Sequence, residues 1–128
     1  MRRWAADATP TGTFGAGVRD AYLQALSNPS CIHAICEEYR AATGLDREHD
    51  DADRASGRRI RCPVLALWSS AGPLGAWYAD EGRPVGLWRA WADDVRGCAV
   101  AGGHFFPEEH PDSTAAALDD FFAAAGAD

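Results

Sequence analysis

Apolar residues recur with a helical period near the start of the chain. Val18, Tyr22 and Leu26 follow one another at spacings of four residues, the separation that places side chains on one face of a helix. Asn28-Pro29 predicts the end of this helix, and Pro29 fits the first position of a second one. We therefore expect two consecutive helices before the middle of the chain.

The second helix is expected over about residues 29–43. Ile32 and Tyr39 share one of its faces, and Gly44 predicts its end. Residues 45–57 (LDREHDDADRASG) are nearly all polar. This segment is typical of a solvated helix, and it lacks the ligand spacing and the glycine of a calcium-binding loop.

The second half of the chain alternates between strand and helix patterns. Residues 62–68 (CPVLALW) form an unbroken apolar run, typical of a strand buried on both faces of a parallel sheet. A helix is expected over 84–95, a second strand over 97–102, and a last helix from about Pro111. The apolar residues of the helix over 84–95 form one stripe: Leu87, Trp88, Trp91 and Val95. The inward face of the last helix is expected to hold Ala115, Leu118, Phe121 and Phe122.

This alternation predicts a parallel α/β layer, but with only two strands. A strand as apolar as VLALW is expected to have a neighbour on each edge and helices over both faces. The pattern supplies no third strand. The sheet is therefore expected to be incomplete, and the chain to be part of a larger domain.

Charge and composition exclude several classes of function. The net charge is −7 and the pI about 4.9, and the basic cluster of Arg58, Arg59 and Arg61 is short and interrupted. Because nucleic-acid binding depends on clustered basic residues, no nucleic-acid partner is expected. The sequence contains no apolar run approaching the ~18 residues of a membrane span, so no membrane partner is expected either.

The four cysteines are scattered and show no metal-binding or disulfide spacing. With no signal peptide evident, we expect reduced thiols and a cytoplasmic protein. Cys31, His33 and Cys36 could share one helix, but no fourth ligand accompanies them. Core packing is favoured over a metal site, and no cofactor is expected.

The segment GGHFFPEEHP, residues 102–111, is the clearest candidate for chemistry. Two glycines after an apolar run favour positive φ or close backbone approach, which predicts that His104 lies on a sharp turn at the end of a strand. Ligands of open α/β sheets bind at this edge, where a histidine can act as a general base. The alternative is a solvated or capping turn histidine.

A nucleophile for His104 is not evident in the sequence. The chain contains neither a G-x-S-x-G elbow nor its aspartate version. Ser69 follows the apolar strand but lacks the glycine pattern of an elbow, and Asp80 lies far along the next loop. Neither is favoured as the nucleophile or as the orienting acid of a triad.

Three segments together resemble one enzyme family. HA-x-CE-x-YRA at residues 33–41, LALW at 65–68 and GHF-x-PEE at 103–109 occur in the order found in haloacetate (fluoroacetate) dehalogenases of the α/β-hydrolase superfamily. The resemblance covers the C-terminal portion of that family. It implies the end of a helical cap over residues 1–57 and, over 58–128, the last two parallel strands of the core with their flanking helices.

The resemblance also implies a reaction and a role for three residues. In this family an aspartate displaces halide from the α-carbon of a haloacetate, and a histidine-activated water hydrolyses the resulting ester. His104 matches the general base, and Tyr39 matches a tyrosine that binds the leaving halide, although it could instead be a core residue. Trp4 matches a cap tryptophan that lines the substrate tunnel.

The part of the family that bears the aspartate has no match in this sequence. The chain is therefore expected to be inactive alone. The expected substrate of the complete enzyme is a haloacid, and the expected partner of this chain is the missing N-terminal half. Two alternatives remain open. One is a fragment of an epoxide hydrolase-like α/β hydrolase, and the other is a non-catalytic binding module that forms a homodimer through its sheet edge.

Overall fold

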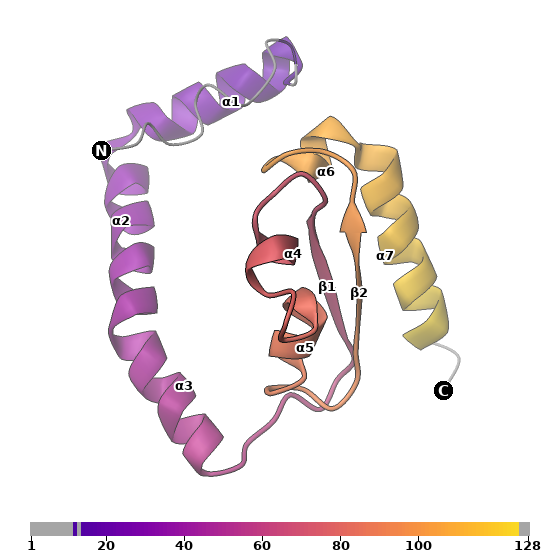
Figure 1. Cartoon of the computed structure of the whole chain (residues 1–128). Helices are drawn as coiled ribbons and strands as arrows, with labels where there is room; N and C mark the ends of the chain where they lie inside the picture. The colour runs from indigo at the N-terminus through magenta and orange to yellow at the C-terminus, as the bar shows by residue number, and fades with distance from the viewer. Residues whose placement is uncertain (1–11, 13, 126–128) are drawn as a thin grey trace. The chain divides into compact units, whose positions relative to one another are not determined.

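The computed structural model describes residues 12 and 14–125 of the chain, which form two compact units (Figure 1). Phe14–Arg59 make up one, here called the helical unit; the described residues from Ile60 onward make up the other, here called the sheet unit. The sequence predicts a boundary between 57 and 58, and the structure divides the chain between 59 and 60. The identification of the two parts as cap and core stays a prediction.

The helical unit consists of three helices that follow one another with short connections. They are α1 (Ala16–Ser27), α2 (Pro29–Thr43) and α3 (Leu45–Ala55). The Asn28 side chain accepts a hydrogen bond of 2.9 Å from the Ser30 N–H, which caps α2, and Pro29 occupies the first turn. Gly44 follows the last residue of α2, as predicted from the sequence.

The apolar side chains of the helical unit remain accessible. Helices α2 and α3 contain no buried residue, and on α2 the exposed fractions are 40% for Ile32, 39% for Ile35 and 74% for Tyr39. The alternative interpretation of Tyr39 as a core residue is therefore wrong for this chain. A tyrosine ring becomes buried only where neighbouring elements pack against it, and the three helices of this unit do not cover Tyr39.

The sheet unit contains a parallel pair of strands, β1 (Val64–Ser69) and β2 (Val95–Val100). The register runs from Val64 opposite Val95 to Ser69 opposite Val100. Within the described residues the sheet has these two strands, as expected of an incomplete sheet. The remaining elements are α4 (Leu74–Trp77), α5 (Arg83–Trp88), α6 (Phe106–Glu109) and α7 (Pro111–Ala125).

The small core of the described chain lies along the two strands and α5. Figure 1 shows α4 and α5 on one side of the strands and α7 on the other. The helix α5 contacts both strands, and α4 contacts β1. The buried apolar residues are Ala66, Trp68, Ala92, Val95 and Val100. Burial of the Trp68 side chain alone removes a large apolar area from water.

The helix predicted over residues 84–95 is shorter in the structure. It ends at Trp88, and Val95 instead begins β2. The Val64 N–H donates a 2.9 Å hydrogen bond to the Asp94 carbonyl, and Val95 is buried opposite Val64. Strand pairing and burial therefore override the helical spacing of the sequence, and Trp88 is left 43% exposed.

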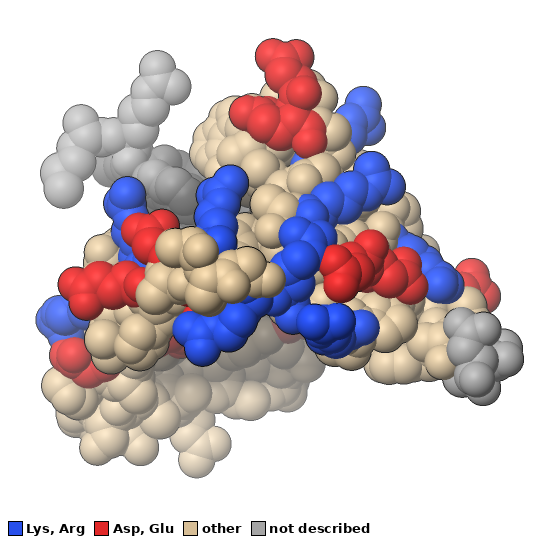
Figure 2. Space-filling view, turned by 90° about the horizontal axis from the view of Figure 1, so that it is seen from below, with Lys and Arg blue, Asp and Glu red and all other residues tan. Residues whose placement is uncertain are grey.

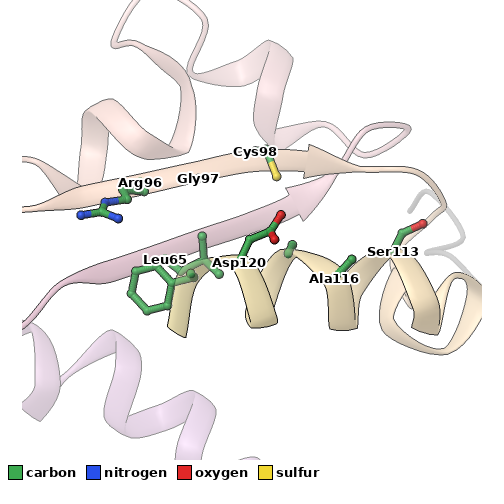
Figure 3. Close-up of a pocket in the computed structure, with 9 residues that line it drawn as sticks. Leu65, Arg96, Gly97, Cys98, Ser113, Ala116 and Asp120 are labelled. Atoms are coloured by element: carbon green, nitrogen blue, oxygen red, sulfur yellow. The ribbon is translucent and has the colours of Figure 1, made fainter. Parts of the chain in front are cut away.

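Helix α7 forms where predicted, but its apolar face is only partly covered. Leu118 is 39% exposed and Phe122 is 64% exposed, so the expectation that both point into a core is wrong for this chain. A hollow of about 450 Å³ separates α7 from the strands, and Leu65, Arg96 and Phe121 are among its lining residues (Figure 3). The described part of the sheet unit supplies no further element to fill this space.

Charged side chains of both signs share the surface. Figure 2 shows arginine side chains next to acidic ones on the face that it presents. Arg58 pairs with Asp53, and Arg96 pairs with Asp94 at 3.1 Å. Such exposed pairs contribute little to stability. None of the helices in the described part of the chain is long and apolar enough to cross a membrane.

Candidate active site

The carboxyl ends of β1 and β2 meet at one edge of the sheet and are joined by hydrogen bonds. The Ser70 N–H donates to the Val100 carbonyl at 2.8 Å. The Ser69 hydroxyl donates to the Gly102 carbonyl at 2.6 Å, and the Ala71 N–H donates to the same oxygen at 3.4 Å. The loop after β1 therefore supports the backbone that follows β2.

Residues 101–105, here called the His104 turn, follow β2 directly. Gly102 has φ +113°, and a Cβ at this position would lie 2.8 Å from Glu109 Oε2. A residue with a side chain would be strained there in conformation and in space. The sequence prediction that the glycines place His104 on a sharp turn at a strand end is thus confirmed.

The Glu109 side chain, at the end of α6, reaches back to this turn. Its Oε2 atom accepts a hydrogen bond from the Gly103 N–H. The sequence motif does not predict this role of Glu109, because PEE enters it only as part of GHF-x-PEE. The sequence does contain a pattern that points to this contact. Two glycines are followed by a proline that can start a helix and then by an acidic residue, so the chain can fold back and bring the carboxylate to the glycines.

The His104 side chain is exposed. Its ring contacts that of Phe105 edge to face, with centroids 5.0 Å apart and an interplanar angle of 81°. Phe105 limits the positions that the ring can adopt. An accessible imidazole on a held turn can take a proton from a water molecule placed against it.

The other candidate residues lie elsewhere. Tyr39 belongs to the helical unit and His104 to the sheet unit. Trp4 lies outside the described residues. Asp80 is exposed between α4 and α5. The Ser69 hydroxyl donates its proton to a backbone carbonyl, which suits an anchor of the turn better than a nucleophile.

The described residues offer no metal site. They contain no group of three or more His, Cys, Asp or Glu side chains placed to hold an ion. His33 Nδ1 lies 3.9 Å from Glu37 Oε1, and Cys31, Cys36, Cys62 and Cys98 are free thiols. The hollow beside α7 is lined by neither His104 nor Glu109.

Comparison with known proteins identifies the fold to which these elements belong. No protein-family model matches the chain. Solved structures do match it: a Pseudomonas aeruginosa protein provisionally named an epoxide hydrolase superposes on 89% of this chain with a TM-score of 0.79 and 37% identity. An α/β hydrolase, also provisionally named, from Nostoc sp PCC 7120 matches 89% of the chain with a TM-score of 0.78 and 38% identity. The chain is part of an α/β hydrolase.

Curated sequences narrow the kind of α/β hydrolase. A fluoroacetate dehalogenase from Burkholderia sp is 32% identical over 102 residues, which is 80% of this chain. A soluble epoxide hydrolase from Corynebacterium sp. (strain C12) is 34% identical over 91 residues, or 70% of the chain. The chain corresponds to the C-terminal portion of a haloacetate dehalogenase-like α/β hydrolase, as the sequence motifs indicate.

The matched region is a minor part of each relative. It represents 32% of the Burkholderia dehalogenase, 28% of the Corynebacterium epoxide hydrolase, and 37% of each of the two solved structures. The chain thus spans about a third of the length of the hydrolases that it matches.

Proposed function

We propose that this part of the α/β hydrolase supplies the general-base histidine of a haloacetate dehalogenase. The observation that carries the proposal is the position of His104, exposed on a glycine turn at the joined carboxyl ends of β1 and β2. This is the edge of an α/β sheet where ligands bind. The 32% identity with the fluoroacetate dehalogenase supports haloacetate as the substrate class.

The reaction has two steps, and His104 acts in the second. In the first, an aspartate carboxylate outside this sequence attacks the α-carbon of the haloacetate. The new C–O bond forms as the C–halogen bond breaks, and the halide leaves with the bonding electrons. In the second, His104 accepts a proton from water, and the resulting hydroxide attacks the ester carbonyl carbon. The bond between the carbonyl carbon and the ester oxygen breaks, glycolate leaves, the aspartate carboxylate is restored, and His104 releases its proton to solvent.

Tyr39 is proposed to stabilise the leaving halide. Its side chain is 74% exposed on α2, so its hydroxyl is available to a group that faces this helix. An O–H donor aimed at a developing anion lowers the barrier, and a poor leaving group such as fluoride gains most from it. Trp4, if it lines the substrate tunnel, would contribute to the same pocket.

The chain alone is proposed to be inactive, because a base without a nucleophile cannot form the ester. The proposed partner is the remaining portion of the hydrolase, which accounts for about two thirds of each relative. The two-stranded sheet and the uncovered apolar face of α7 support this proposal. Both are features that additional strands and helices would cover.

A second candidate is an epoxide hydrolase that uses the same pair of aspartate and histidine. The 34% identity with the soluble epoxide hydrolase favours it. In that case the first attack opens an epoxide ring and no halide is released. The two candidates therefore differ in what leaves in the first step, and a halide assay separates them.

The test is a chimera in which the N-terminal portion of the Burkholderia dehalogenase is fused ahead of this chain at the matched boundary. The expected result is fluoride release from fluoroacetate by the chimera and none by the chain alone. His104→Ala should slow turnover by about 10²–10⁴-fold, the usual contribution of a general base. It should also leave the ester on the aspartate, visible as added mass in intact-protein mass spectrometry.

His49→Ala is the matched control, because His49 is an exposed histidine on α3. The chimera with this substitution should turn over at the wild-type rate.

Tyr39→Phe should slow fluoride release by about 10- to 100-fold, the range expected for losing a hydrogen bond to a charged group. Conversion of an epoxide without any fluoride release would favour the second candidate. A defined dimer of the isolated chain in light scattering, with no activity in the chimera, would favour a binding module instead.

A further inference from the structure

The peptide group between Gly102 and Gly103 is held at both of its polar ends. Its carbonyl oxygen accepts hydrogen bonds from the Ser69 hydroxyl and the Ala71 N–H. Its N–H donates to the Glu109 carboxylate. Because a peptide group is planar, bonds at opposite ends of the plane fix its orientation. The next residue along the chain is His104.

We propose that Glu109 is a positioning residue for His104, acting through the Gly102–Gly103 peptide. The inference rests on the proposed role of His104 as a general base. Glu109 does not react in that mechanism. Its carboxylate fixes the plane of the preceding peptide and so sets the direction in which the imidazole leaves the backbone.

The packing of the carboxylate supports a fitted contact. A Cβ on Gly102 would lie 2.8 Å from Glu109 Oε2, and a Cβ on Gly103 would lie 3.0 Å from Oε1. Both carboxylate oxygens therefore lie against the two glycines. They occupy the space that the Cβ atom of any other residue at position 102 or 103 would need. The two glycines that make the turn possible also allow the carboxylate to approach it.

The chemistry of the contact favours a carboxylate. An ionised acceptor forms a stronger hydrogen bond with a backbone N–H than a neutral one does. The bond is partly buried, so less water competes for either partner. Donors on the carbonyl oxygen and an anion at the N–H polarise the peptide in the same direction, so the bonds strengthen one another.

The first test measures the contact in the 128-residue chain without requiring activity. In ¹H–¹⁵N spectra recorded over an acidic pH series, the Gly103 amide proton should lie downfield and move upfield as Glu109 is protonated. Glu109→Gln keeps the shape of the side chain but should abolish this titration. Asp112→Asn removes a nearby exposed carboxylate in α7 and should leave it unchanged. A Gly103 signal that titrates equally in wild type and Glu109→Gln would overturn the contact.

The second test asks whether the contact positions the histidine. In the active chimera, Glu109→Gln should slow ester hydrolysis by about tenfold while ester formation keeps its rate. Glu109→Asp, which retains the charge on a shorter side chain, should not restore hydrolysis. Equal hydrolysis rates in wild type and Glu109→Gln, with the Gly103 titration lost, would overturn the positioning role. An inactive wild-type chimera would count against the proposed function but not against the contact between Glu109 and Gly103. The contact is measured in the 128-residue chain, without any activity assay.

Discussion

The helical unit and the sheet unit are stabilised in different ways. In the helical unit, α2 begins and ends through contacts with its sequence neighbours, and α2 and α3 bury no residue. In the sheet unit, Val64 pairs with Val95, which lies 31 positions further along the chain. The Ser69 hydroxyl bonds to the Gly102 carbonyl, 33 positions further along. All of the buried apolar residues of the described chain belong to this second unit.

This difference explains why the candidate base is well defined in the chain while its proposed companion is not. The surroundings of His104 are built from residues that the sheet unit itself contains. Tyr39, by contrast, is placed by the local geometry of α2 alone and is mostly exposed. A long-range hydrogen-bonded site can be complete within a part of an enzyme, whereas a pocket wall needs the elements that face it.

The largest expected effect is on the core of the sheet unit. Trp68→Ala should destabilise this unit by about 3–5 kcal/mol, because it leaves a large cavity beneath the strands. Trp68 is 7% exposed, and Trp77, at 65%, provides a matched control whose replacement by Ala should have little effect. Hydrogen exchange should show loss of protection in β1 and β2 but not in α2. Equal loss in α2 would mean that the two units unfold together.

An intermediate effect is expected at the His104 turn. Gly102→Ala should cost about 2–3 kcal/mol, because the substitution combines an unfavourable φ with a close contact to Glu109. Gly57 also has positive φ, at +70°, but a Cβ there would meet nothing within 4 Å. Gly57→Ala should therefore cost less, about 1 kcal/mol. Urea unfolding of the two variants gives the comparison, and equal costs would show that crowding at Gly102 is unimportant.

The smallest effect should be confined to the helical unit. Asn28→Ala removes the side-chain cap of α2 and should cost about 1 kcal/mol of local stability. Asn28→Asp keeps an acceptor and should preserve the helix. Amide exchange in the first turn of α2 should rise in the alanine variant, while exchange in β1 and β2 stays the same. A change in the strands would reveal coupling between the units.

The parts of the fold that the sequence predicts are those with local causes. Helix α2 is marked by Pro29 at its start and Gly44 after its end, and both positions are confirmed. The His104 turn is marked by Gly102, whose positive φ only a glycine adopts without strain. Incompleteness of the sheet also follows from the sequence, because an apolar strand with a single partner is unusual.

The parts that the sequence could not supply depend on distant residues. Val95 has helical spacing with Leu87 and Trp91, yet it pairs with Val64 in the sheet. Glu109 is one of several acidic residues near the C-terminus, and only the folded chain shows that its carboxylate reaches Gly103. The same holds for Ser69, whose role as an anchor of the turn requires the two strand ends to be adjacent.

The hydrogen bonds that orient the Gly102–Gly103 peptide come from residues 69, 71 and 109, and all of them lie after residue 60. The gene segment that encodes the histidine therefore also encodes the residues that orient it. Recombination between related hydrolase genes at a point before residue 60 would exchange the helical unit while passing on this turn unchanged. Descendants of such an exchange would differ in their helices and inherit the same proposed base together with its supports.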